Sequence, residues 1–97
     1  LGAMLMAVGL PYDSDEGRAL GGALSAIMTG VSYATSAEMA AELGAFDGYE
    51  RNAEHMLRVI RNHRNAAYGA TEGYEGLAVK PVPLDLTNCP DARLVDL

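Results

Sequence analysis

The stretch "DSDEGRALGGALSAIMTGVSYATSAEMAAELG", Asp13 to Gly44, decides the fold because it predicts one long helix. Apolar residues recur along it at alternating steps of four and three, which is the period of one helix face. This apolar stripe consists of Leu20, Leu24, Ile27, Val31 and Ala34. We expect the helix to cover residues 14–43 and to end at Gly44, since glycine is common just after a helix end.

A ridge of small residues beside the stripe predicts close helix packing. Its members are Ala19, Ala23, Ala26, Gly30, Ala37 and Ala41. Small side chains let neighbouring helices approach, so we expect this helix to be buried on more than one side. Gly21, Gly22 and Gly30 each cost about 1 kcal/mol of helix stability relative to Ala, which tertiary packing has to offset. Two alternatives concern Gly30: a kink in one helix, or two helices that meet there.

The acidic cluster of Asp13, Asp15 and Glu16 has two interpretations, a metal or acid–base site and a helix start. Asp13 as N-cap with Glu16 three residues later has the spacing of a capping box. A calcium loop needs an oxygen ligand at its fifth position and a carboxylate at its twelfth. Counted from Asp13, these positions hold Gly17 and Leu24. The spacing therefore favours a helix start.

Helix signals elsewhere predict a mainly α chain with three or four helices and one extended loop. Gly9 and Pro11 separate the first helix from the second, and Pro90 is placed as a first-turn residue of the last. Pro81 and Pro83 enforce extended backbone, so Leu77, Val79 and Val82 are expected along a groove. Residues 1–97 are expected to form a single partial domain. The expected helices cover about 1–8, 14–43, 52–68 and 90–97, with the extended loop at 70–88.

The helix expected at 52–68 has an apolar and a polar face. Ala53, Met56, Leu57, Ile60 and Ala67 share the apolar side, and the polar side carries Arg58, Arg61, Asn62 and Asn65. Such a charged face is typically solvated, and an anionic partner is the alternative. His55 and His63 lie about two turns apart, too far to share a metal within the helix. Cys89 has no identifiable base, which favours a packing role over a nucleophile.

Composition narrows the function classes. The 97 residues have a net charge of −6, which argues against general nucleic-acid binding. The single cysteine favours a reducing, cytoplasmic compartment, and no apolar run has the length of a membrane span. The first residues lie inside a helical pattern and the last helix has barely begun, so we expect a piece of a larger protein. No catalytic or metal-binding residue can be assigned, and cofactor-binding residues remain unknown.

Three phrases of the chain resemble the adenosylcobalamin-dependent (class II) ribonucleotide reductases, from Leu1 to about Ala92. They are "LGAMLMAVGLPYDSDEGRALGGALSAIMTG", "YATSAEMAAELGAFDGYERNAEHMLRVIRNHRNAAYGA" and "YEGLAVKPVPLDLTNCPDA". The resemblance implies a segment of a ten-stranded α/β barrel that makes deoxyribonucleotides by radical chemistry. Cobalamin generates a thiyl radical in that family, two further cysteines supply electrons, and thioredoxin-like proteins reduce them.

The resemblance carries no catalytic residue onto this chain. The family's Asn-x-Cys-x-Glu loop, its phosphate-binding stretch and its C-terminal cysteine pair are absent, and "TNCPDA" around Cys89 matches none of its catalytic cysteines. We therefore expect an inactive helical layer whose partner is the rest of the barrel, with adenosylcobalamin as cofactor of the whole enzyme only. A free-standing helical module that self-associates through Leu20, Leu24, Ile27 and Val31 is the alternative. A small metalloprotein is the third interpretation.

Overall fold

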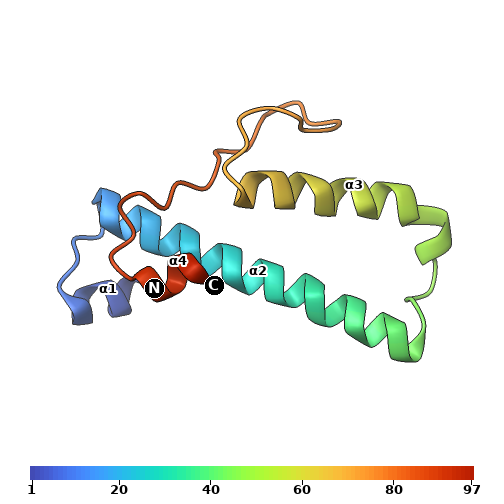
Figure 1. Cartoon of the computed structure of the whole chain (residues 1–97), viewed down its shortest axis with the longest axis horizontal. Coiled ribbons are helices and arrows are strands. Elements are labelled where there is room, and N and C mark those ends of the chain that lie inside the picture. The colour runs from blue at the N-terminus through green and yellow to red at the C-terminus, as the bar shows by residue number, and fades with distance from the viewer. The chain divides into compact units, whose positions relative to one another are not determined.

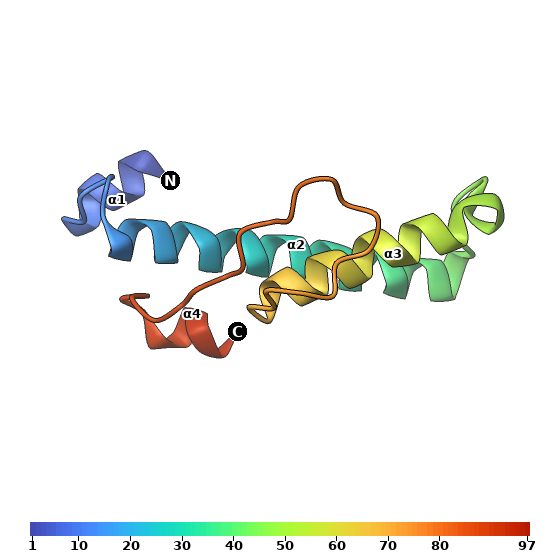
Figure 2. The ribbon, with the colours of Figure 1, turned by 90° about the horizontal axis from the view of Figure 1, so that it is seen from above.

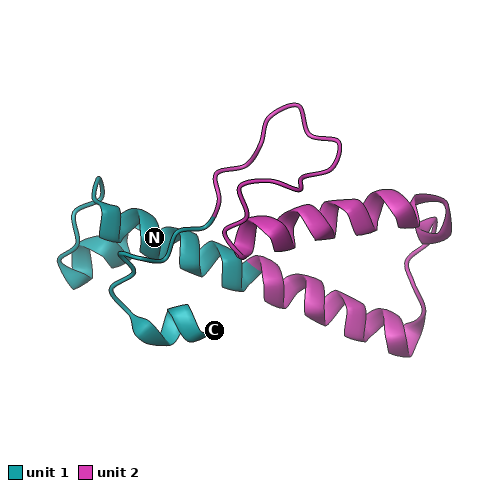
Figure 3. Cartoon of the chain, turned by 45° about the horizontal axis from the view of Figure 1, so that its top comes forward, with its two compact units in different colours: residues 1–28, 84–97 teal, residues 29–83 magenta.

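The computed structural model describes residues 1–97 and contains four helices and no strand (Figure 1). The helices are α1 (Gly2–Val8), α2 (Asp15–Leu43), α3 (Tyr49–Ala67) and α4 (Ala92–Asp96). The expected mainly α class is confirmed. The chain divides into two compact units, residues 1–28 with 84–97, and residues 29–83 (Figure 3). We call them unit 1 and unit 2.

Helix α2 passes through Gly30 without interruption (Figure 2). The alternative of two helices meeting there is therefore wrong, while a kink stays a prediction. The helix ends at the expected place: Gly44 follows it with φ 87°, and its N–H donates to the Ala40 carbonyl at 2.9 Å. A positive φ suits glycine because it has no Cβ.

The first helix ends as its glycine predicts. Gly9 has φ 75°, and its N–H donates to the Met6 carbonyl at 3.2 Å. The next N–H, that of Leu10, donates to the Leu5 carbonyl at 2.9 Å. This pair of bonds is the usual left-handed closure of a helix, and it lets the chain turn toward the start of α2.

Unit 1 contains all the buried apolar side chains of the protein. Leu5 comes from α1, and Ala19, Leu20 and Ala23 come from the first turns of α2. Two glycines of α2 make room for neighbours in this unit. A Cβ at Gly22 would lie 2.9 Å from Leu84 Cδ1, and one at Gly21 would lie 3.4 Å from Leu1 Cδ2. Gly21 and Gly22 thus lie against close neighbours, whereas a Cβ at Gly30 would meet nothing within 4 Å, so the packing expected to offset its cost is not found there.

Unit 2 consists of α2 from Thr29 on, the turn after it, helix α3 and the chain that follows α3 as far as Pro83. An edge-to-face contact joins Tyr33 of α2 to His63 of α3, with ring centroids 5.6 Å apart. Helix α3 begins at Tyr49, not near residue 52, because Gly48 at φ 84° starts the helix directly after the turn. The single buried residue of α3 is Asn62, on the side expected to be solvated.

Burial of the apolar stripe of α2 stops at the end of unit 1, which corrects the expectation of a buried helix. Leu20 is buried and Ile27 half-buried, whereas Val31 is 59% exposed and Ala34 is also exposed. On the small-residue ridge, Ala37 and Ala41 are exposed as well. The ridge is therefore buried at Ala19 and Ala23, whereas Ala37 and Ala41 are not buried against a second helix of this chain.

No helix or strand forms between α3 and α4 (Figures 1 and 2). Leu77, Val79 and Val82 lie in no groove of this chain, since these side chains are 46%, 82% and 91% exposed, and the groove stays a prediction. The last helix begins at Ala92, because the Asp91 carboxylate accepts the Arg93 N–H at 3.0 Å and caps it. Pro90 therefore precedes the N-cap instead of occupying the first turn.

Candidate functional site

The acidic cluster at the start of α2 binds an arginine of its own helix. Arg18 donates to Asp13 Oδ1 at 2.6 Å and to Asp15 Oδ1 at 2.7 Å. These two hydrogen bonds, the one from Asp15 first, raise the pKa of the Arg18 guanidinium. All three side chains are exposed, and exposed ion pairs contribute little to stability. Two of the three carboxylates considered as metal or acid–base groups, Asp13 and Asp15, are thus engaged with a cation of the protein itself.

The cap of α2 is Ser14, not the predicted Asp13. The Gly17 N–H donates to Ser14 Oγ at 3.0 Å, and that hydroxyl donates to the Pro11 carbonyl at 2.7 Å. The capping-box prediction is wrong by one residue, because Asp13 turns to Arg18 instead. Gly17 is required here, since a Cβ would lie 2.8 Å from the Pro11 carbonyl oxygen.

A more elaborate polar arrangement joins α3 to the chain that follows it, all within unit 2. Asn62 Nδ2 donates to the Glu75 carbonyl at 2.9 Å, and the Glu75 N–H donates to Asn62 Oδ1, also at 2.9 Å. Asn62 is 7% exposed and is the one buried polar residue of the protein. One amide side chain therefore satisfies both backbone groups of Glu75, as a neighbouring strand would.

Two further side chains of α3 hold the same segment. Arg61 contacts both carboxylate oxygens of Glu75, at 2.7 and 2.9 Å, and Asn65 Nδ2 donates to the Gly73 carbonyl at 3.1 Å. The bond from Arg61 holds the pKa of the Glu75 carboxyl below its usual range. We call Arg61, Asn62 and Asn65 with residues 73–75 the polar clasp.

The clasped segment turns at glycines. Gly73 and Gly76 have φ values of 83° and 66°, a conformation that other residues rarely adopt. A Cβ at Gly76 would also lie 3.3 Å from Arg58 Nη1. Between these glycines the Tyr74 hydroxyl donates to the Ala70 carbonyl at 2.6 Å. The polar face of α3 was expected to meet solvent or an anionic partner, but three of its side chains bind the protein's own loop.

The remaining candidate residues are not brought together. His63 Nδ1 lies 2.9 Å from the Val59 carbonyl and its ring meets Tyr33, while His55 is exposed. Cys89 is half-buried and its thiol lies 3.7 Å from the Asp91 carbonyl. The structure contains no group of three or more His, Cys, Asp or Glu side chains placed to hold one metal ion.

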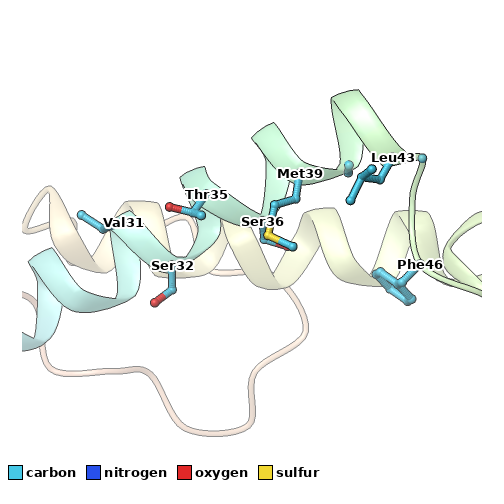
Figure 4. A pocket seen from close by; sticks show the side chains of 9 residues that line it. Val31, Ser32, Thr35, Ser36, Met39, Leu43 and Phe46 are labelled. Carbon is cyan, nitrogen blue, oxygen red and sulfur yellow. The ribbon is translucent and has the colours of Figure 1, made fainter.

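An open apolar hollow follows one side of α2 in unit 2. Val31, Thr35, Met39 and Leu43 succeed one another along the helix, and Phe46 lies just beyond its end (Figure 4). Met39 and Phe46 are each 57% exposed and Leu43 is 81% exposed. We call these five residues the α2 apolar face. The spacing of four from Val31 to Leu43 places these four residues on one stripe of the helix, and Phe46 follows the helix end.

The polar clasp holds the backbone of the loop after α3, and the α2 apolar face presents apolar surface. The clasp residues Asn62 and Asn65 were missed as functional because a polar helix face gives no sequence signal for a partner that lies in a loop. The pair of glycines at 73 and 76 is the signal that indicates a tight turn nearby. None of the four helices has both the length and the apolar composition of a membrane span.

Comparison with known proteins gives a consistent result. Residues 1–79 match the family model described as ribonucleotide reductase, barrel domain. The vitamin B12-dependent ribonucleotide reductase of Bradyrhizobium diazoefficiens is 68% identical over 95 residues, which cover 98% of this chain and 8% of that protein. The protein of the same name from Agrobacterium fabrum is 65% identical over 95 residues, with the same two shares.

A more distant relative agrees. The vitamin B12-dependent ribonucleotide reductase of Streptomyces avermitilis is 51% identical over 85 residues, which cover 88% of this chain and 8% of that protein. The chain thus spans about a twelfth of the length of these relatives.

Proposed function

The chain belongs to the ribonucleotide reductase barrel-domain family, and from this membership we propose that it is a structural segment of an adenosylcobalamin-dependent ribonucleotide reductase. In the whole enzyme the segment forms a helical layer against the rest of a ten-stranded α/β barrel. The whole enzyme reduces ribonucleotides to deoxyribonucleotides in the cytoplasm, and thioredoxin-like proteins supply its electrons. The segment alone is inactive.

One observation carries the proposal of a packing role. Four apolar residues are buried, Leu5, Ala19, Leu20 and Ala23, whereas 18 large hydrophobic residues are exposed. A soluble monomer rarely leaves so much apolar surface in contact with water, and contiguous exposed patches mark interaction sites. The α2 apolar face is such a patch, and its helical spacing suits a second helix or a barrel wall.

The cofactor belongs to the remainder of the enzyme. Small-molecule sites are concave and enclose most of their ligand. The hollow on the α2 apolar face has one wall, formed by a single helix and Phe46, and lies open on the other side. The residues present therefore do not form a site for a ligand as large as adenosylcobalamin.

The catalytic groups also belong elsewhere. Radical reduction of a ribose needs an active-site thiol and a pair of thiols that supply electrons, whereas the only cysteine here is Cys89. Its thiol lies 3.7 Å from the Asp91 carbonyl, and the Asp91 carboxylate is engaged by Arg93. We therefore propose that the segment contributes to catalysis by holding the positions of neighbouring parts of the barrel.

An exchange of segments tests this function. The matching 95 residues of the Bradyrhizobium diazoefficiens reductase are replaced by this chain, and adenosylcobalamin-dependent reduction of a ribonucleotide is measured. We expect the chimaera to be active and the isolated chain to be inactive. The control is the same reductase with the segment deleted, for which we expect no activity.

Two results would contradict the proposal. Turnover by the isolated chain would show that it carries catalytic groups of its own. Activity of the deletion control would show that the enzyme does not need the segment.

A further inference from the structure

The most exposed apolar segment of unit 2 lies just after the polar clasp. Residues 77–82, which we call the loop tip, carry Leu77, Val79 and Val82, with 46%, 82% and 91% of their surface exposed. No backbone–backbone hydrogen bond of the protein involves these residues. Exposed valines with unpaired backbone groups are what a binding segment presents before it meets its partner.

The base of the loop tip is fixed, which distinguishes it from a flexible tail. Asn62 holds both backbone groups of Glu75 at 2.9 Å, and Arg61 holds the Glu75 carboxylate. Gly76, at φ 66°, then turns the chain beside the Arg58 guanidinium. A segment ordered beforehand loses less conformational entropy when it binds.

The charge and the prolines of the loop tip make its burial less costly. Its one charged residue, Lys80, donates to Glu72 Oε2 at 2.7 Å, so the pair carries no net charge into an interface. Pro81 within the tip and Pro83 after it have no N–H to desolvate, and their fixed φ limits the unbound conformations. A solvent-facing loop has no need of these features.

We propose that the loop tip is a docking segment that inserts Val79 and Val82 into an apolar groove of the remaining barrel domain, with the polar clasp as its positioning element. This inference rests on the proposed function, which supplies the partner. The partner is the rest of the same enzyme because the relatives, matched over 98% of this chain, contain about twelve times its length. A second copy of the chain is the competing occupant.

Thiol labelling tests the docking. Val82→Cys is introduced into the isolated chain and into the full-length chimaera, and modification by a maleimide is followed at that peptide by mass spectrometry. Each rate is divided by the rate in denaturant to remove intrinsic thiol reactivity. We expect labelling at least about tenfold slower in the chimaera, because a buried thiol is shielded from reagent. Equal normalised rates would overturn the proposal.

Thr71→Cys, an exposed position before the clasp, is the matched control. We expect a smaller slowing there than at position 82. Equal slowing at both positions would mean that the whole loop is covered without a docking tip, and would contradict the proposal. Labelling at position 82 that slows in the isolated chain as its concentration rises would identify a second copy as the occupant and overturn the choice of partner.

The role of the polar clasp in positioning the loop tip is tested by substitution of Asn62. Asn62→Ala in the chimaera should restore at least half of the labelling rate of the isolated chain at position 82, whereas the exposed Asn52→Ala should not. Unchanged protection in Asn62→Ala would remove the clasp from the proposal. An inactive chimaera that is protected at position 82 would contradict the proposed function and support the docking proposal. An active chimaera that is labelled freely at position 82 would support the proposed function and contradict the docking proposal.

If the chimaera does not fold, amide hydrogen exchange on the natural enzyme tests the docking instead. The Bradyrhizobium diazoefficiens enzyme is then compared directly with the 97-residue chain over the segment that aligns with the loop tip. We expect slower exchange in the full-length enzyme. Equal exchange would overturn the docking proposal.

Discussion

Different interactions stabilise the interior of each of the two units of this chain. In unit 1 the buried residues are apolar, namely Leu5, Ala19, Leu20 and Ala23. In unit 2 the buried residue is an asparagine, and hydrogen bonds from Asn62 and Asn65 shape its loop. Unit 1 therefore resembles a small self-packed core, whereas unit 2 orders its backbone with polar contacts and leaves its apolar residues outside.

This difference indicates which part of the chain depends on a partner. Burial of apolar surface is the main stabilising force in folding, and unit 2 makes little use of it internally. Its α2 apolar face and its loop tip are both exposed, while no buried side-chain polar atom lacks a hydrogen-bond partner. Such a division is expected where the apolar core is completed by other parts of a larger domain.

We expect the greatest loss of stability when the apolar core of unit 1 is disrupted. Leu20→Ala removes the largest side chain contributed by α2 to the buried cluster of unit 1, at a cost of about 2–5 kcal/mol of unfolding free energy. Urea denaturation followed by circular dichroism measures this cost. Met39→Ala, on the exposed α2 apolar face, is the control and should change the midpoint little in the isolated chain. A similar loss for both would contradict the assignment of the core to unit 1.

We expect the second largest loss of stability when the polar clasp of unit 2 is disrupted. Asn62→Ala leaves the Glu75 N–H and carbonyl without partners, at a cost of about 1–3 kcal/mol. We expect faster amide exchange over residues 70–76, with little change in α1. Asn52→Ala, which loses one exposed bond to the Gly48 carbonyl, is the matched control. Equal effects of the two variants would show that the clasp does not order the loop.

A smaller effect distinguishes the observed helix cap from the predicted one. Ser14→Ala removes the acceptor of the Gly17 N–H and should cost about 1 kcal/mol of stability. Asp13→Ala loses only an exposed ion pair and should cost less. The two urea midpoints decide the matter, and a larger loss for Asp13→Ala would restore the capping box first expected.

The smallest effect is that of acid on the clasp. The pKa of Glu75 is lowered by its bond from Arg61, so the stabilisation is complete above the ordinary glutamate pKa of 4.5 and is lost as the pH falls through the lower folded value. Residues 73–75 should therefore loosen below pH 4.5, as read from their NMR shifts. Glu75→Gln should abolish this step. An unchanged step in Glu75→Gln would assign it to another carboxyl.

Local signals in the sequence predicted the helices well and their environment less well. Gly9 and Gly44 end helices where expected, because the ability to adopt a positive φ is a property of glycine itself. The cap of α2 was assigned to Asp13 because capping residues are similar, and the choice of Ser14 depends on the nearby arginine Arg18. Family membership followed from whole phrases, which carry more information than any one motif.

The candidate site was the least predictable part. The bonds of Asn62 join residues 13 positions apart, and no helix periodicity specifies such a partner. The stripe from Leu20 to Ala34 is one apolar face in the sequence, yet its burial ends within α2. Periodicity reports that a face is apolar, but it does not report whether the partner lies in the same 97 residues.

The most direct test of this account is amide hydrogen exchange over residues 31–46, compared between the isolated chain and the full-length chimaera. The first turns of α2, from 15 to 23, serve as the internal reference because their packing lies within unit 1. We predict at least about tenfold slower exchange over 31–46 in the chimaera, with a smaller change over 15–23. Equal rates over 31–46 in the two proteins would show that the α2 apolar face meets no partner and would contradict the account.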